Sequence, residues 1–471
     1  MKFAAKYARF LLLVCSVVVA RADRVKLTTP TSHQLAFQDL ELGVFIHYSI
    51  DTYAPTRAAP GSTPASAFTP TELDAEQWVL AAKAMGATFV VLTARHEQGF
   101  CLWPTATTDY SVKSSPYKNG KGDIVREFVD ACRKYGLKVG LYTPPWIDSH
   151  WELSQTDLSG GSETGRIDKL DNPKAYERAL AKEKEQLREL MTNYGPLVFI
   201  WDDHFGRSDS IDAVAHGGKF REFYSTLAKW SHSLQPDCFY FGPDVEHVGN
   251  EDAHCCYPMW NAINTIDGTD MTIGTTFKWE RDNVGDPSGK FFRPRLGCTT
   301  VGFSTGGWMW DGARRPRSLD RRVQIYYETI GRGANVLVNL TPDRRGLIPE
   351  DLAVAAKEMG SEIKHRFSIP LAQTSGAGPV HVLKLGHPQM FDHVITMEDM
   401  RDGQKISKYV VEALVNGKWQ TLLEGQTVGH KRIDRFAPVT ATEVRFTCTE
   451  SVSQPIALRS IAIYSVGHKT L

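Results

Sequence analysis

Short apolar runs with no polar alternation recur between about residue 40 and residue 365, and amphipathic helical patterns separate them. A strand that is apolar on both faces needs cover on both sides, which parallel sheets receive from helices. The repeated order of helix, glycine and strand predicts right-handed βα crossovers. The expected strands are residues 43–48, 88–93, 138–143, 197–202, 239–242 and 335–340.

Three helical patterns each start at a residue that favours a helix N-terminus and stop near a glycine. They run from Asp74 to Gly86, from Asp123 to Gly136 and from Pro173 to Gly195. Only six strands are clear, but the number of βα units favours a closed (β/α)8 barrel of the TIM type over an open sheet. In such a barrel the chemistry lies at the C-terminal ends of the strands.

The pattern changes after residue 366. Short runs of alternating apolar and polar residues follow, and Asn416-Gly417 is a hairpin signal between two of them. The expected fold class is therefore α/β, with a (β/α)8 barrel over residues 23–366 and a C-terminal antiparallel β-sandwich over residues 367–471. Within the barrel region, residues 154–165 (SQTDLSGGSETG) predict a mobile loop beside the barrel mouth, and the alternative is a featureless surface insertion.

The N-terminus has the pattern of a secretory signal peptide. Basic residues at 2, 6 and 9 precede an apolar stretch over residues 10–20, and Ala20-Arg21-Ala22 is a small-x-small cleavage site. The alternative is an uncleaved anchor helix, but the apolar stretch is short for a membrane span of ~18 residues or more. We therefore expect residues 1–22 to be removed and the mature chain to be secreted, lysosomal or at the cell surface, with no membrane span.

Charge and cysteine content exclude some functions. Lys+Arg and Asp+Glu are both 54, so no excess positive charge favours nucleic acid as a partner. Seven of the eight cysteines remain after Cys15 leaves with the signal, without a Cys-x-x-Cys pair, and we expect no metal site. The sequon Asn339-Leu340-Thr341 ends an apolar strand and precedes Pro342, which indicates a structural role rather than a glycan acceptor.

Polar groups follow several of the expected strands. A single histidine at a strand end is usually structural, but this rim collects histidines, a tyrosine and carboxylates, with tryptophans nearby. Sugars present C–H faces to aromatic rings and hydroxyls to polar groups, and glycosidic cleavage needs two carboxyl groups that flank the bond. The residues alone therefore indicate a sugar-handling barrel. They are His47, His96, Glu97, Tyr142, Asp202, Asp203 and Glu251, with Trp103, Trp146, Trp151, Trp201, Trp308 and Trp310.

Longer segments carry a resemblance. They are LGVFIHYS, the stretch over residues 90–146, NYGPLVFIWDD, GPDVEHVGNED and YYETIGRGANVLVNLTPDRRGLIPEDL, which span nearly the whole mature chain in order. These segments resemble glycoside hydrolase family 29, the α-L-fucosidases. VGNE and PDRRGLI resemble the subgroup that acts on α-1,3/1,4-linked fucose in branched Lewis-type glycans, and the C-terminal region resembles the discoidin-like sandwich often attached to that subgroup.

The resemblance implies a retaining exo-glycosidase that uses a double displacement and no metal or organic cofactor. Its partner would be a fucosylated oligosaccharide or glycoprotein glycan. Asp203, two residues after Trp201, matches the nucleophile, and Glu251 matches the general acid/base. A retaining pair is expected ~5–5.5 Å apart. Asp202 either raises the pKa of Asp203 by like-charge repulsion or points outward, and we favour the outward orientation.

The resemblance also implies a substrate-binding set. His47, His96, Tyr142 and Trp201 match positions that hold the sugar hydroxyls and ring, and Trp308 matches a tryptophan that packs on the side of the C6 methyl. Glu97 and Trp103 complete the predicted set.

Several positions depart from the family pattern, and they cluster on the sugar-binding rim. The family commonly has a second histidine at Glu97, an aspartate at Gln98, a glycine at His204 and Arg-Pro-Gly-Trp where this chain has Thr305-Gly306-Gly307-Trp308. These changes bear on hydroxyl recognition and leaving-group preference more than on fold. They keep two alternatives open: the same scaffold with altered sugar specificity, and a catalytically inactive glycan-binding relative.

Overall fold

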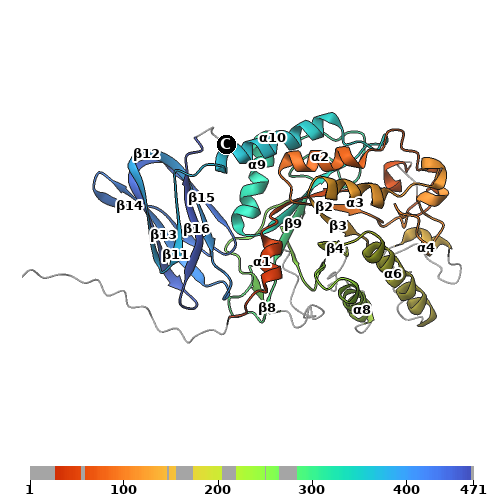
Figure 1. Ribbon diagram of the computed structural model, residues 1–471, viewed down its shortest axis with the longest axis horizontal. Helices are drawn as coiled ribbons and strands as arrows, with labels where there is room; N and C mark the ends of the chain where they lie inside the picture. Colours follow the sequence, from red (N-terminus) through yellow and green to blue (C-terminus); the bar gives the residue numbers. More distant parts are fainter. Residues whose placement is uncertain are drawn as a thin grey trace, which may run out of the picture.

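The computed structural model describes residues 27–54, 59–145, 148–154, 173–203, 219–249, 251–264 and 284–467. The predicted signal peptide and the loop over residues 155–165 lie outside these ranges. Figure 1 shows an α/β body and, beside it, a C-terminal body made of β-strands. Within the described ranges, no helix has both the length and the apolar composition needed to cross a bilayer.

Eight parallel strands form the barrel, as predicted, in the order β5-β4-β3-β2-β1-β10-β9-β6. The two outermost strands of this order follow one another in the chain, and a parallel bridge between Phe241 and Val245 joins them. The strands are β1 (Leu42–Ile46), β2 (Phe89–Thr93), β3 (Lys138–Tyr142), β4 (Phe199–Trp201), β5 (Phe239–Tyr240), β6 (Glu246–Val248), β9 (Arg295–Thr299) and β10 (Asn335–Leu340).

Helices cover most of the barrel (Figure 1). The described residues between β5 and β6 contain no helix. A small antiparallel sheet of β7 (Ala262–Ile263) and β8 (Phe291–Phe292) comes between β6 and β9 in the chain. The helices are α1 (Ser32–Gln38), α2 (Ala75–Met85), α3 (Ile124–Lys134), α4 (Ser149–Ser154), α6 (Pro173–Asn193), α8 (Lys219–Leu234), α9 (Leu319–Glu328) and α10 (Glu350–Phe367). Short 3-10 turns are η1 (Ile50–Thr52), η2 (Ala65–Ala67), η3 (Val112–Ser114), η4 (Tyr117–Gly120) and η6 (Ile330–Arg332).

All three predicted helices form with the predicted start residues, whereas α3 and α6 end two residues before the predicted glycines. The Asp74 carboxylate accepts two backbone N–H groups in the first turn of α2, at 2.8 and 3.2 Å, and Gly86 ends that helix with φ of 94°. Asp123 accepts the Arg126 N–H at 2.9 Å and caps α3. These side chains satisfy donors that the first helical turn leaves without partners.

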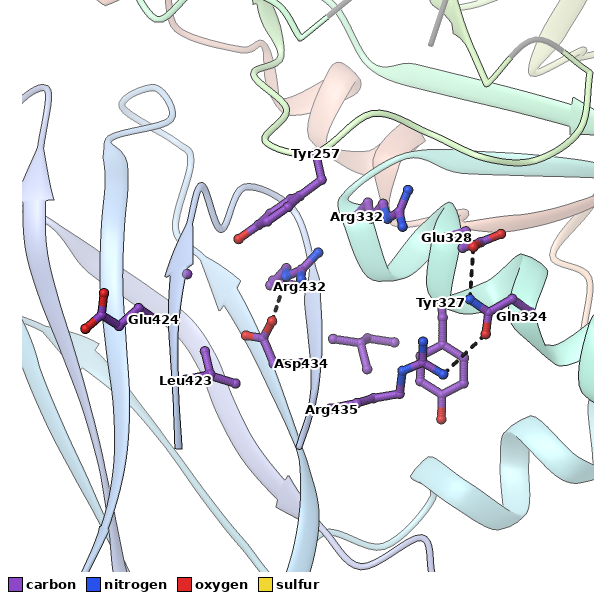
Figure 2. Close-up of a pocket in the computed structure, with 12 residues that line it drawn as sticks. Tyr257, Gln324, Tyr327, Glu328, Arg332, Leu423, Glu424, Arg432, Asp434 and Arg435 are labelled. Carbon is purple, nitrogen blue, oxygen red and sulfur yellow. Dashed lines mark hydrogen bonds and ion pairs between the residues drawn. The ribbon is translucent and has the colours of Figure 1, made fainter. Parts of the chain in front are cut away.

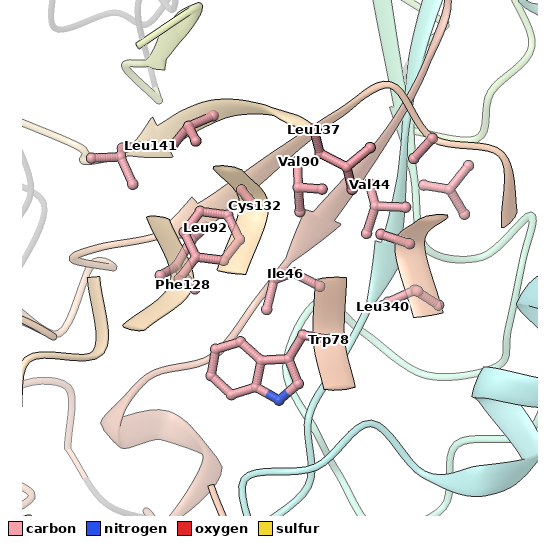
Figure 3. Packing of buried hydrophobic residues seen from close by; sticks show 14 of the residues in the cluster. Val44, Ile46, Trp78, Val90, Leu92, Phe128, Cys132, Leu137, Leu141 and Leu340 are labelled. Atoms are coloured by element: carbon pink, nitrogen blue, oxygen red, sulfur yellow. The ribbon is translucent and has the colours of Figure 1, made fainter. Parts of the chain in front are cut away.

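The strands are apolar throughout because alternate side chains enter two different cores. In Figure 3, Trp78 of α2 and Phe128 of α3 gather with Ile46 and Leu92 on the outer face of the sheet. The neighbouring residues in each strand fill the inside of the barrel, mainly with rings such as Phe45. The side-chain direction at each strand end therefore follows from this alternation.

The C-terminal domain is an antiparallel β-sandwich built from one hydrogen-bonded sheet, in the order β11-β16-β12-β15-β13-β14. Its two longest strands contain register shifts, and the sheet folds around a core that includes Phe391, Val411 and Val444. Asn416 and Gly417 have φ of 50° and 76° and form the predicted hairpin turn. The strands are β11 (Ala372–Ala377), β12 (Val380–Glu398), β13 (Ile406–Val415), β14 (Lys418–Gln426), β15 (Arg432–Ser451) and β16 (Ala457–Tyr464).

The two domains meet through polar contacts and stacked cations. A cavity of about 300 Å³ lies at this junction, and Figure 2 shows residues that line it. Arg432 lies 3.7 Å from the centre of the Tyr257 ring, and Arg435 lies 4.4 Å from that of Tyr327. Glu328 and Arg332 of its barrel wall come just before the start of β10. The cavity therefore lies toward the amino ends of the strands, away from the rim where the predicted site residues gather.

Candidate active site

The carboxyl ends of the barrel strands bring four aromatic or imidazole rings together. His47 follows β1, His96 follows β2 and Tyr142 ends β3, while Trp308 comes from the loop after β9. The His96 ring stacks on Tyr142 at 5.3 Å, and the His47 ring lies 4.7 Å from Trp308 and 5.8 Å from His96. These four predicted residues form one wall of a common site.

Asp203 faces this wall. The Tyr142 hydroxyl donates to Asp203 Oδ2 at 2.8 Å. Burial, with the charge of Asp203, raises the pKa of Tyr142, so that the phenol stays protonated and remains a donor. Trp201 points into the barrel two residues earlier, where its ring stacks on Phe241 at 4.2 Å. Asp203 therefore continues the inward side of β4.

Asp202 lies on the other side of the same strand end. It lies two residues after Ile200, on the same side of the strand, and Ile200 belongs to the outer core. Its Oδ2 accepts the Tyr240 hydroxyl at 2.5 Å. The predicted outward direction is thus correct, although the carboxyl is fully buried beneath the helices rather than solvated. Burial, together with the charge of Asp203, raises the pKa of Asp202 well above its usual value.

Glu251 reaches the wall from the loop after β6. Its side chain is exposed, and Trp308 Nε1 donates to Glu251 Oε2 at 3.3 Å. The backbone of Glu251 is in the left-handed region with φ of 61°, which is uncommon for a residue other than glycine and costs on the order of 1 kcal/mol. The loop therefore holds this carboxyl in a strained conformation beside Trp308.

The two histidines differ in charge preference. Burial lowers the pKa of His47 well below its usual value, and the charges of His96 and Arg314 act in the same direction. Burial alone would lower the pKa of His96 too, but Asp51, Glu97 and Asp203 outweigh it and raise that pKa. His47 is therefore a neutral imidazole at neutral pH, whereas His96 is protonated more readily than an ordinary histidine.

The remaining predicted residues have different placements. Glu97 is partly buried, and its charge acts on both His96 and Tyr142, which places it near the wall. Trp103 is not part of it: the ring is buried in the outer core and its N–H donates to Glu189 Oε2 of α6 at 2.7 Å. Trp103 is therefore better explained as a packing residue than as a sugar contact.

Among the departures from the family pattern, the Gln98 side-chain oxygen accepts the backbone N–H of Gly61. Gln98 thus fixes a neighbouring loop. His204 and Trp146 lie outside the described residues.

Three residues that were not predicted as site residues contact the predicted ones and hold them in place. Asn339 and Arg314 are both buried and bind the loop that carries Trp308. Asp51 lies 3.6 Å from the His96 ring. Asn339 had a signal in the sequence, because a polar residue near the end of an apolar strand needs a partner. Asp51 lies in the short turn η1 and Arg314 in a polar loop, and neither had such a signal.

The arrangement suits a substrate with hydroxyls and an apolar face. Two carboxylates, Asp203 and Glu251, are held by the donors Tyr142 and Trp308 of one wall. Within the described ranges no three His, Cys, Asp or Glu side chains gather as metal ligands. A closed barrel with carboxylates and rings at the carboxyl ends of its strands is typical of the carbohydrate-processing (β/α)8 enzymes.

Comparison with known proteins narrows this class. The Alpha-L-fucosidase family model matches residues 62–365. The chain belongs to this family, glycoside hydrolase family 29, and is thus a hydrolase of α-L-fucosyl bonds whose substrates are fucosylated glycans.

Individual relatives are similar in sequence to this chain along most of its length. Alpha-L-fucosidase 1 of Arabidopsis thaliana is 31% identical over 454 residues, with 88% of this chain and 83% of that protein covered. Plasma alpha-L-fucosidase of Homo sapiens is 24% identical over 341 residues, with 70% of this chain and 61% of that protein covered. A crystal structure of a glycoside hydrolase 29 family member from an unknown rumen bacterium has a TM-score of 0.77 at 30% identity, with 94% and 78% of the two chains covered.

Proposed function

We propose that the protein is a retaining exo-α-L-fucosidase with Asp203 as nucleophile and Glu251 as general acid/base. The supporting observation is a continuous set of contacts between these two carboxyls. Asp203 accepts from Tyr142 and acts electrostatically on His47, the His47 ring lies 4.7 Å from Trp308, and Trp308 donates to Glu251. Both carboxyls therefore border the space in front of one wall.

The first step forms a bond between Asp203 Oδ and C1 of fucose. The glycosidic C1–O bond breaks, and the proton of Glu251 passes to the leaving oxygen. In the second step Glu251 takes a proton from water, the water oxygen attacks C1, and the Asp203 carboxylate is released. Two inversions give α-L-fucose with retained configuration.

The neighbouring residues have distinct roles in this proposal. The Tyr142 hydroxyl orients the nucleophile, and the Trp308 N–H orients the acid/base while its ring faces the apolar side of the sugar. His47, His96 and Trp201 contact the hydroxyls and ring. Glu97 supplies a charged acceptor to a hydroxyl, where the family commonly has histidine. Such contacts accelerate the reaction when they strengthen as the ring flattens.

We further propose that the substrates are branched glycans with α-1,3/1,4-linked fucose. The VGNE segment that carries Glu251 and the PDRRGLI segment support this choice, since both resemble the subgroup with that specificity. The chain would meet such glycans in the secretory pathway. The N-terminal signal pattern supports that location, as does the relative from Homo sapiens whose name places it in plasma.

Kinetics with an aryl α-L-fucoside and a Lewis-type trisaccharide test the proposal. We expect Asp203→Ala to lower kcat/KM about a thousandfold or more on both substrates. Glu251→Ala should lower it by about 10²–10⁴-fold on the trisaccharide. The loss should be smaller on an aryl fucoside with an acidic phenol, because that leaving group needs no proton.

Azide separates the two roles. With Glu251→Ala it should intercept the fucosyl-enzyme and give α-fucosyl azide, whereas with Asp203→Ala it should replace the nucleophile and give the β-anomer. NMR identifies both products. A first-formed β-fucose from the wild type, or full activity of Asp203→Ala, would refute the mechanism. Glycan binding without release would favour an inactive relative, and release of galactose alone would favour altered sugar specificity.

A further inference from the structure

Asn339 connects two residues of the proposed site from inside the barrel. It lies on the inner side of β10, two residues after Leu337, and is 1% exposed. One end of its side-chain amide lies 3.0 Å from His47 Nδ1, and the other lies 2.9 Å from the Trp308 carbonyl oxygen. Both neighbours come from other parts of the barrel, namely the end of β1 and the loop after β9.

The chemistry of these contacts fixes which way the amide points. A backbone carbonyl oxygen only accepts, so the Asn339 atom that faces Trp308 must be the Nδ2 donor. The same NH₂ group lies 3.0 Å from Thr341 Oγ1, whose own hydroxyl lies 3.2 Å from the Trp308 oxygen. Thr341 therefore donates to that oxygen and accepts from Asn339, which agrees with this orientation. The atom that faces His47 is then Oδ1, which only accepts.

We propose that Asn339 is a positioning residue that holds His47 as the Nδ1–H tautomer, so that its Nε2 accepts a hydrogen bond from a substrate hydroxyl. The hydroxyl contact rests on the function proposed above. Because the Asn339 oxygen needs a donor, His47 Nδ1 must carry the ring proton. A neutral ring then has a lone pair at Nε2, the nitrogen on the other side of the imidazole.

Burial keeps the His47 ring in this neutral form, and three charged groups around it also act on its pKa. They are His96 after β2, Asp203 after β4 and Arg314 in the loop after β9. Burial, His96 and Arg314 lower the pKa of His47, whereas Asn339 and Asp203 oppose them without reversing the shift. An accepting nitrogen in a buried wall discriminates against substrates without a hydroxyl at that place, because the nitrogen would then have no partner.

The same amide fixes the distance between His47 and the Trp308 loop. Arg314 holds that loop from the other side, since its guanidinium donates to the Met309 oxygen at 3.0 Å and to the Gly307 oxygen. Asn339 is the residue that ties this loop to His47 itself. The pair formed by the His47 and Trp308 rings, 4.7 Å apart, thus depends on it.

Nitrogen-15 NMR of histidine-labelled protein tests the tautomer directly, with the His47 signals assigned by their absence in His47→Gln. We expect a protonated Nδ1 and an unprotonated Nε2 over the neutral pH range. A protonated Nε2 in the wild type would overturn the proposal. This measurement needs neither a substrate nor a variant of Asn339.

Asn339→Asp tests the positioning role. The new carboxylate faces the Trp308 carbonyl and favours a protonated His47, so the pKa of His47 should rise and KM for an aryl α-L-fucoside should increase about tenfold or more as pH falls through it. The matched control is Asn335→Asp, because Asn335 is equally buried at the other end of β10 and donates to the Phe37 oxygen at 2.7 Å.

Both variants should lose similar stability, but only Asn339→Asp should change the His47 signals and the pH dependence of KM. Equal effects of the two variants on KM and on those signals would contradict a positioning role. The predicted tautomer without any release of fucose would contradict the proposed function and the hydroxyl contact, and would leave the assignment of the ring proton intact.

Discussion

Asp202 and Asp203 show how one peptide bond separates two chemical environments. The inner carboxyl has a tyrosine donor and faces the site, whereas the outer carboxyl is buried beside Tyr240. Strand alternation is visible in the sequence, so the direction of each side chain was predictable. The burial of Asp202 was not, because the helices that cover it come from distant segments.

Asp202→Asn should leave kcat/KM within about threefold of wild type, since the amide matches the shape and neutrality of a protonated carboxyl. The raised folded pKa means that the unfolded chain releases the Asp202 proton at a lower pH than the folded protein. Wild-type stability therefore falls as pH rises above the unfolded value of 3.8, and the amide removes this loss. The variant should gain stability relative to wild type from pH 4 upward, as measured by urea unfolding. A gain that shrinks with rising pH would contradict the assignment.

Other residues mark the limits of reasoning from sequence. Trp103 lies in the loop after β2, as Trp308 lies in the loop after β9, but the loop of Trp103 turns back to α6, and its Glu189 partner reveals this direction. Asn339 was predictable as a structural residue. Its link to His47 and Trp308 depends on barrel closure, which brings β10 beside β1 and the loop after β9.

At the level of elements, the predicted strands were those with a continuous apolar run. All six form, whereas β6 and β9 were missed. β6 has three residues and contains Glu246 and His247, and β9 begins with Arg295, so neither has an apolar run of strand length. β9 pairs in parallel with β6 on one side and with β10 on the other, and this pairing defines both missed strands. Pairing between distant segments cannot be predicted from local composition.

A buried ion pair joins α6 to the end of β2, next to His96. The Arg95 guanidinium donates to both Glu183 oxygens at 2.8 and 2.9 Å, and it lies 3.7 Å from Asp148. Loss of one partner leaves a buried charge, so Glu183→Gln should lower the free energy of unfolding by about 3 kcal/mol. Urea titration measures this loss.

The matched control for that variant is Glu185→Gln on the same helix. Glu185 pairs with Arg188 at 2.6 Å, but both side chains are about two-fifths exposed, at 39% and 44%. Its loss should stay within about 0.5 kcal/mol, because solvent screens exposed pairs. Equal losses for the two variants would show that burial does not strengthen the Arg95 pair.

At the level of the whole molecule, the sequence predicted two domains but not how they dock. The contacts join residues far apart in the chain: Asp39 meets Arg459 at 2.6 Å, and the Asn261 N–H donates to Gln404 at 2.9 Å. Ile433 and Tyr464 of the β-domain also belong to the same core as the barrel helices. Such an interface indicates that the β-domain braces the barrel, since removal of either side would expose apolar and charged groups together.

Glu41 is a carboxyl with a lowered pKa at this junction, and it offers a pH test of docking. It lies just before β1 and binds two residues of the β-domain, Lys431 at 2.5 Å and His430 at 3.0 Å. Burial alone would raise the pKa of Glu41, but the His430 hydrogen bond and the Lys431 charge outweigh it and lower the pKa to about 2. The unfolded value is 4.5, so the stabilisation is complete above pH 4.5 and is lost as pH falls toward 2.

Glu41→Gln should therefore cost on the order of 2 kcal/mol at pH 7, and the difference from wild type should shrink steadily between pH 4.5 and pH 2. Glu450→Gln is the control, because its pair with Lys408 lies within the β-domain and is more than half exposed. That variant should change stability by less than about 0.5 kcal/mol at any pH. Urea unfolding monitored at both pH limits measures the two differences. A cost of Glu41→Gln that does not depend on pH would mean that the docked interface gains nothing from the ionised carboxylate, and that apolar packing around Ile433 and Tyr464 holds the domains together.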